Sequence, residues 1–304
     1  MWRVVKEFKF EEIAPAWAKS HLQVPTTVLI KDRLRTYYAT RDQNGRSQLM
    51  HFDTPAEDPT NIIAKSDKPL VRTGNPGTFD QDGVMVSSVV PMGDEIFIYY
   101  TGWRMTIGVP YITDSGLLVG SASRNNFKRL SHGPVLGINS REPYFTNTPY
   151  VYKIGENYGM IYGSGKGWIL DNDRYEPIYQ LRITTSSDGI VWGNPVSDLN
   201  LHSKLDNCTV RASLLPGTKS RYFYSEREAT NFRGNNGSYK IKEFNFDENG
   251  NINTLGEIKF EFPKEIEAQN MLAYPNCVSE NTNLMYFNGS NFGKKSIFLA
   301  VEEK

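Results

Sequence analysis

The feature that most constrains this chain is an internal repeat of about 62 residues. A short aromatic strand that ends in a small residue occurs five times, and one aromatic residue marks each copy. The markers are Tyr38, Tyr100, Tyr162, Tyr224 and Phe287, at intervals of 62, 62, 62 and 63 residues. A fixed period of this size is typical of folds that repeat one supersecondary unit.

Each copy reads as an antiparallel group of strands. A strand-like run lies before each marker, with Pro25, Ser87, Pro149 and Arg211 thirteen residues before the first four markers and Pro275 twelve before the fifth. Turn residues such as Lys31-Asp32 and Pro216-Gly217-Thr218 separate the two strands, and a third strand follows. Five such groups predict an all-β, five-bladed β-propeller, whose radial packing leaves few sheet edges exposed. Two sandwich domains are the rival architecture, but they do not predict five equal intervals.

The repeat also sets the expected domain limits. We expect one domain over residues 1–304, with blades at about 11–75, 76–135, 136–200 and 201–264, and a last blade made of 265–304 together with 1–10. The last copy ends without a fourth strand. Because residues 2–10 alternate like a strand, we expect them to complete that blade and close the ring.

Composition excludes several classes of protein. Lys plus Arg and Asp plus Glu balance at 34 each, which gives no reason to expect nucleic acid or an anionic membrane as a partner. The N-terminus lacks the apolar core of a signal peptide, and no apolar run approaches the roughly 18 residues of a membrane span. We therefore expect no membrane span and a cytoplasmic location.

The chain offers no pattern for a metal or a cofactor. Cys208 and Cys277 are expected to be buried free thiols, as is usual in a reducing cytoplasm. The four histidines, His21, His51, His132 and His202, have no zinc-type spacing. The glycine-rich run 163–167 follows a strand without a helix and is not a phosphate-binding loop. The sequence thus predicts neither a metal site nor a cofactor.

Propeller topology locates a site before any function is known. The first strand of each blade lines the axis and the second runs antiparallel to it, so residues before first strands and after second strands meet at one mouth. Five carboxylates fall at such positions: Asp80, Asp82, Glu142, Asp206 and Glu226. Aromatic and basic candidates there are Trp103, Arg104, Lys166, Trp168, Arg211 and Arg227, with His21 close to the start of a first strand.

These residue types suit carbohydrate chemistry. Paired carboxylates can divide general acid and base work, and arginine forks bind hydroxyl, carboxylate or phosphate groups. Trp faces pack on the apolar side of a sugar ring. Structural readings stand beside these: Asp80 and Asp82 could build the turn at Gly83, Glu142 could pair with Arg141, and Glu226 with Arg227 could brace neighbouring blades.

Several motifs resemble a known group. Five blades, carboxylates at first-strand starts and a hairpin at 187–192 that looks like a short S-x-D-G-x-x-W box resemble the five-bladed glycoside hydrolases of the arabinanase, xylosidase and invertase superfamily. The runs 78–84, 99–103 and 148–151 look more closely like uncharacterised glycosylase-like propellers of bacterial polysaccharide-synthesis loci. The resemblance covers roughly residues 20–230.

This resemblance implies roles for particular residues. The superfamily draws an Asp base from the first blade, an Asp that tunes a pKa from the second and a Glu acid from the third. Glu142 matches the third position, and Asp80 or Asp82 the second. The first blade here offers 20–23, Ser-His-Leu-Gln, without a carboxylate. A hydrolase needs a second carboxylate opposite the acid, so Asp206 or Glu226 replaces it, or the protein is no conventional hydrolase.

The sequence therefore predicts a carbohydrate-active enzyme that cleaves or transfers a glycosyl group at the mouth of the propeller. Glu142 would be the acid, and Asp80, Asp82 or Asp206 the base or nucleophile. The substrate would be a carbohydrate or a nucleotide-sugar. A non-catalytic glycan-binding propeller is the alternative, and a protein-interaction scaffold is a third reading. The oligomeric state stays open.

Overall fold

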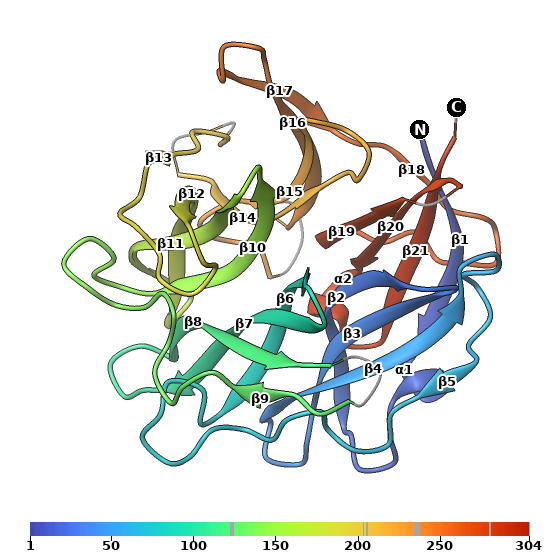
Figure 1. The fold of residues 1–304 in the computed structure, drawn as a ribbon, viewed down its shortest axis with the longest axis horizontal. Coiled ribbons are helices and arrows are strands. Elements are labelled where there is room, and N and C mark those ends of the chain that lie inside the picture. Colours follow the sequence, from blue (N-terminus) through green and yellow to red (C-terminus); the bar gives the residue numbers. More distant parts are fainter. Residues whose placement is uncertain (122–124, 203, 205, 234–237, 280, 304) are drawn as a thin grey trace.

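The computed structural model describes residues 1–121, 125–202, 204, 206–233, 238–279 and 281–303, with the side chain of Ser290 excepted. Its regular secondary structure is nearly all β-strand, and Figure 1 shows the strands in successive groups around a centre. The arrangement is a propeller-like all-β fold. Its two helical segments have four residues each, α1 (Phe10–Ile13) and α2 (Ser290–Gly293), so no described helix could cross a membrane.

Five antiparallel groups follow one another along the chain. The first contains β2 (Ser20–Ile30), β3 (Arg33–Arg41), β4 (Ser47–Pro55) and β5 (Ala64–Lys65). The second contains β6 (Gly83–Met92), β7 (Glu95–Met105), β8 (Tyr111–Gly120) and β9 (Lys128–Arg129). The third contains β10 (Thr146–Ile154), β11 (Asn157–Asp171), β12 (Arg174–Ser186) and β13 (Ser197–Asp198). One parallel residue pair, Ser47 with Gly83, joins the first two groups into a single sheet.

The last two groups complete the chain. The fourth contains β14 (Cys208–Leu214), β15 (Arg221–Arg227), β16 (Lys240–Phe246) and β17 (Ile252–Glu257). The fifth contains β19 (Ala273–Ser279), β20 (Asn283–Asn288) and β21 (Ser296–Glu302), and it gains β1 (Trp2–Lys9) and β18 (Phe260–Glu261). β1 pairs antiparallel with β21 from Trp2–Glu302 to Lys9–Ser296. The two ends of the chain thus lie side by side in one sheet (Figure 1).

The first strands of the groups surround the centre. β2 contacts β6, β6 contacts β10, β10 contacts β14, β14 contacts β19, and β19 contacts β2 again. These five strands are the innermost ones in Figure 1. Residues that precede or end them therefore gather near one axis.

The marker residues and their predecessors explain the aromatic repeat. Successive side chains of a strand point to opposite faces, so each pair fills two different gaps between groups. Tyr37 packs in the cluster with Val84 and Ile98 of the second group, whereas Tyr38 packs with Phe8 of the fifth. The remaining pairs divide in the same way: Tyr99 and Tyr100, Ile161 and Tyr162, Phe223 and Tyr224, Tyr286 and Phe287. Five apolar clusters thus separate successive groups.

The small residue after the marker pins the next first strand. Thr101 Oγ1 accepts a hydrogen bond from the Thr148 N–H (2.8 Å), and Ser225 Oγ accepts one from the Tyr274 N–H (2.8 Å). Asn288 Oδ1 does the same for the Val24 N–H (2.8 Å). Each bonded residue has a positive φ, of 43°, 60° and 53° respectively, at a bulge in its strand. Bulges re-aim side chains, and these three lie at the centre of the fold.

Both cysteines are free and buried, as the sequence predicts.

Candidate functional site

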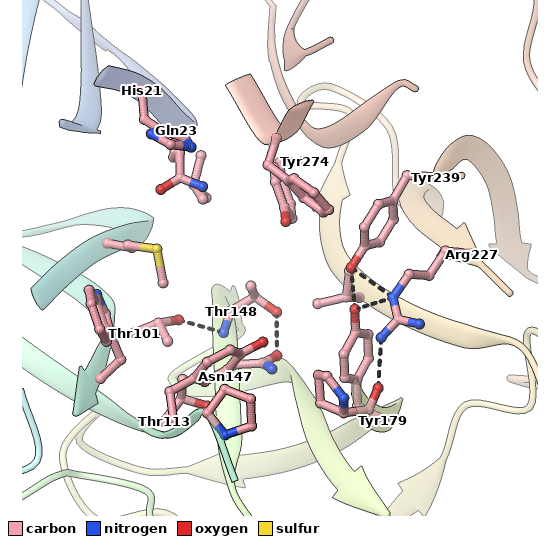
Figure 2. A pocket seen from close by; sticks show the side chains of 18 of the residues that line it. His21, Gln23, Thr101, Thr113, Asn147, Thr148, Tyr179, Arg227, Tyr239 and Tyr274 are labelled. Atoms are coloured by element: carbon pink, nitrogen blue, oxygen red, sulfur yellow. Dashed lines mark hydrogen bonds between the residues drawn. The ribbon is translucent and has the colours of Figure 1, made fainter. Parts of the chain in front are cut away.

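A cavity of about 420 Å³ opens where the five groups meet. Figure 2 shows its walls, with side chains that point inward from first strands, from the ends of second strands and from nearby loops. The first three groups contribute His21, Gln23, Val24, Arg41, Met85, Thr101, Trp103, Met105, Pro110, Tyr111, Thr113, Asn147, Thr148, Arg174, Pro177 and Tyr179. The last two contribute Val210, Arg227, Phe232, Arg233, Tyr239, Tyr274 and Phe292.

The walls are basic and aromatic. Four arginines and four tyrosines line the cavity, and none of the described lining residues is an aspartate or a glutamate. One buried carboxylate lies just behind the wall: Glu176 binds Arg233 through two nitrogens, at 2.5 and 2.9 Å, and lies 3.3 Å from Arg174. A single negative charge thus serves two of the four arginines. The wall keeps a net positive charge, and a pocket of this sign attracts anions.

Arg227 organises one wall. Its Nε donates to the hydroxyls of Tyr179 (2.9 Å) and Tyr239 (3.2 Å), which are also hydrogen-bonded to each other. Its other nitrogens donate to the backbone carbonyls of Pro177, Glu228 and Ala229. The guanidinium is 2% exposed and stacks on the ring of Phe232 at 3.7 Å. Because these partners are all neutral, they fix the guanidinium in place without balancing its charge.

Burial raises the pKa of Tyr111 to about 12 and holds the pKa of Tyr179 and Tyr274 well above the usual range. These three hydroxyl groups are protonated at neutral pH.

Three buried polar atoms of the wall have no partner within the described chain. They are Nε of Arg41, Oε1 of Gln23 and Oγ1 of Thr113. Gln23 is 6% exposed and Thr113 is 4% exposed. A buried polar atom without a hydrogen bond costs free energy, so such atoms at a cavity are typical of a ligand site.

Three sequence-predicted binding residues line the cavity: His21, Trp103 and Arg227. Trp103 is held at the end of β7 by a hydrogen bond from Nε1 to Ser47 Oγ (2.6 Å). A Cβ added to Gly83 would lie 2.0 Å from that Nε1, so glycine is required beneath the indole.

The four other predicted binding residues lie outside the lining. Arg211 of β14 is fully buried and donates to the carbonyl of Ser87 on β6 and to the carbonyl of Pro25 and Oγ1 of Thr26 on β2. Its place is inside the ring, where it joins first strands. Arg104 lies 3.8 Å from Asp114, and Lys166 lies 3.4 Å from Asp198. Trp168 packs edge-on against Tyr111 and supports the wall from behind (ring centroids 5.6 Å apart).

Glu142 and Asp80 are buried instead of exposed at the rim. Glu142 is 1% exposed and accepts hydrogen bonds from Tyr162 (2.7 Å), Ser164 (2.5 Å) and Arg182 (2.8 Å). It therefore does not pair with Arg141 as the structural reading supposed; Arg182 supplies the charge. Asp80 is held likewise by Tyr100 (3.0 Å), Thr78 (3.0 Å) and Arg129 (2.6 Å).

The other three predicted carboxylates are also absent from the cavity lining. Asp82 accepts from the backbone N–H of Met105 (2.8 Å) and from Gln81 (3.1 Å). Glu226 accepts from Asn207 (2.6 Å) and Lys242 (2.8 Å) rather than pairing with Arg227. Asp206 is exposed. None of the five predicted acids is brought to the cavity wall, and their catalytic roles stay predictions.

Sequence reasoning missed most of the basic wall. Arg41 is the last residue of the second strand β3, at a position that topology brings to the mouth. Arg174 comes after a two-residue turn, Asn172-Asp173, whose positive φ values of 48° and 62° mark a tight hairpin that carries β11 and β12 toward the cavity. That turn can be recognised in the sequence. Arg233 lies in a loop after β15, and no sequence pattern indicates that it faces the cavity.

Comparisons with known proteins identify the fold. No family model matches the chain. Among solved structures, a glycosyl hydrolase from Bacteroides ovatus has a TM-score of 0.67 at 16% identity, covering 97% of this chain and 90% of that one. A structure described as "The GH130 family of mannoside phosphorylases contains glycoside hydrolases that target beta-1,2 mannosidic linkages in Candida mannan" has a TM-score of 0.68 at 14% identity, over 97% and 88%. A thermostable family-43 glycoside hydrolase has a TM-score of 0.65 at 9% identity, over 96% of each chain. The chain thus has the fold of the propeller glycoside hydrolases, which confirms the resemblance at that level.

The sequence relatives carry no described activity. The chain is 27% identical to the uncharacterized protein Rv1502 of Mycobacterium tuberculosis, over 94% of each. It is 32% identical over 177 residues to the uncharacterized protein MT1551 from another strain of that species, 58% of each.

Proposed function

We propose that this protein takes an anionic saccharide into its central pocket. The observation that carries the proposal is the wall itself, which has four arginines and no carboxylate among its described lining residues. Aromatic side chains beside these arginines suit a sugar ring, and the fold is that of carbohydrate-active propellers. We take the five strand groups to be five blades of one domain closed by β1, because a pocket on the axis then has five walls.

Calorimetry with matched ligands tests this proposal. Glucose, glucuronate, glucose 1-phosphate and UDP-glucose share a hexose ring and differ in charge. We expect at least one anionic ligand to bind at least about tenfold more tightly than glucose, or ~1.4 kcal/mol. Affinity should fall as salt is raised, because the attraction is electrostatic. Equal binding of glucose and of all the anions would refute the proposal.

Glycosyl cleavage or transfer with paired carboxylates is the second candidate. The likeness in fold to glycoside hydrolases over almost the whole chain favours it. The pocket wall does not supply the pair, so such a reaction requires Glu142 or another of the five acids to reach the substrate. Product formation from a panel of glycans and nucleotide-sugars, lost in Glu142→Gln, would support this candidate over binding alone. Ligand binding without product across the panel would favour the glycan-binding function.

A further inference from the structure

We infer that Arg41 and His21 form a subsite for the phosphoryl group of a phosphorylated sugar, and that His21 takes up a proton from solvent when that group binds. The inference rests on the proposed anionic saccharide and names its charged group. It follows from four observations on the pocket wall.

First, Arg41 is the pocket arginine left without a partner in the described chain. Arg174 and Arg233 share Glu176, and Arg227 is engaged by hydroxyls and carbonyls. The side chain of Arg41 makes no described hydrogen bond or ion pair, and its Nε is buried. Burial lowers the pKa of Arg41, which shows that the charge is poorly solvated. A guanidinium in this position is ready to bind an anion.

Second, the backbone places His21 next to the partner of Arg41, because Ser20 pairs with Arg41 across β2 and β3. His21 has a φ of 71°, and its N–H donates to the carbonyl of Lys294 (3.1 Å). Its Nδ1 lies 2.7 Å from Ser20 Oγ, and the ring lines the cavity (Figure 2). The bulge in β2 that turns this side chain inward is a strained conformation of the kind found at functional sites.

Third, the groups around His21 oppose its protonation in the free pocket. Burial, together with the positive charges of Arg41 and Lys294, lowers its pKa to about 4. The titratable groups that act on Arg41 in turn are Tyr274, Tyr111 and Arg233, none of which is a carboxylate. His21 is therefore neutral at pH 7. An anion on Arg41 would offset these charges and raise the pKa of His21.

Fourth, the wall suits a phosphoryl group on a sugar better than a lone carboxylate. A phosphate monoester carries up to two negative charges and three acceptor oxygens, which matches several unbalanced cations. Thr113 Oγ1 can donate to such an oxygen, whereas Gln23 Oε1 needs a donor, as a sugar hydroxyl provides. Gln23 pairs with Ala39 on β3, two residues before Arg41. The acceptor of Gln23 and the guanidinium of Arg41 therefore lie on the same side of the pocket.

The sign of the pH dependence follows from the pKa of His21. That pKa is about 4 in the free protein and higher in the complex, so the complex holds more proton between these values. Binding should therefore strengthen as pH falls from 7 to 5.5. The diphosphate diester of UDP-glucose does not titrate in this range, so it isolates the contribution of the protein.

The test measures the binding of inorganic phosphate, glucose 1-phosphate, UDP-glucose and glucuronate by calorimetry at pH 7 and 5.5. We expect Arg41→Gln to weaken phosphorylated ligands by about tenfold or more, and Arg41→Lys, which keeps the charge and loses the fork, to weaken them less. His21→Gln should abolish the strengthening at pH 5.5 while retaining binding at pH 7. Arg33→Gln is the matched control, because Arg33 begins the strand that Arg41 ends and lies outside the pocket. It should change nothing, and melting temperatures check that each variant is folded.

The outcomes separate this inference from the proposed function. Unchanged binding in Arg41→Gln overturns the subsite, and an unchanged pH response in His21→Gln overturns the proton uptake. Binding of glucuronate alone overturns the phosphoryl group and leaves the anionic saccharide standing. Arg41-dependent binding of inorganic phosphate without any sugar ligand supports the subsite and overturns the proposed function. Glucose 1-phosphate and UDP-glucose tell a sugar phosphate from a nucleotide-sugar.

Discussion

At the scale of single residues, two of the acids that match the glycosidase pattern are tied into the fold. Glu142 and Asp80 each accept a hydrogen bond from the marker tyrosine of their own group and from an arginine on a later strand. The same tyrosine position bonds to backbone carbonyls in two other groups, where Tyr38 binds Ile13 and Tyr224 binds Leu201. In these four groups the repeated contact anchors the segment that leads into the first strand.

A substitution at Glu142 therefore affects stability. Glu142→Gln removes the charge that faces Arg182 and disturbs three buried hydrogen bonds, so we expect unfolding to become easier by about 1–3 kcal/mol. Urea denaturation measures the change. Asp206→Asn, at an exposed acid, is the control and should stay within about 0.5 kcal/mol. Unchanged stability of Glu142→Gln together with lost turnover would instead mark Glu142 as a catalytic acid.

At the scale of elements, the second strand of each group connects its own group to the groups on either side. Its paired aromatic residues fill the two gaps on either side, and the small residue that follows pins the next first strand. Because the pinned N–H groups belong to bulges near the cavity, the packing between groups also sets the cavity wall. Ser225, for example, holds Tyr274, which lines the pocket.

Ser225→Ala tests this coupling. The variant leaves the buried N–H of Tyr274 without its acceptor, so we expect a loss of about 1–3 kcal/mol in the free energy of unfolding. Saccharide binding should weaken as well, since Tyr274 is no longer held. Ser187→Ala, at an exposed serine, is the control for denaturation and calorimetry. Full stability with full binding in Ser225→Ala would show that the hydrogen bond is dispensable.

At the scale of the whole molecule, the N-terminal strand joins the two ends of the chain. Trp2, Val4 and Phe8 of β1 are buried, and they pack in the clusters on either side of the fifth group. β1 covers the edge of β21 along its length. Without it that edge would be free to pair with another chain.

Two variants test the closure. Phe8→Ala should cost about 3–5 kcal/mol, because it empties a buried site between the fifth and first groups. Arg3→Ala, on the exposed face of the same strand, should cost little. Deletion of residues 2–10 should lower both solubility and melting temperature. Unchanged melting of the deletion variant would argue against closure by β1.

The sequence by itself determined the strand order and the packing between groups, because both depend on local periodicity. An interval of 62 or 63 residues sets the repeat, and alternation along a strand decides that Tyr37 and Tyr38 face different neighbours. It also predicted where the cavity lies, since topology alone brings first-strand starts to one axis. His21, Trp103 and Arg227 were predicted on that basis, and they line the cavity.

Only the tertiary structure decided which charged side chains face that cavity. Both carboxylates and arginines occur near the predicted mouth, and their local sequence does not say which are neutralised by distant partners. Arg182 and Arg129 lie 40 and 49 residues beyond the acids they bind, and these contacts bury Glu142 and Asp80. Bulges with positive φ, such as those at His21 and Val24, turn other side chains inward, against the simple alternation of a strand. Long-range ion pairs and local backbone distortion thus make the wall of the pocket basic. The sequence repeat does not predict this charge.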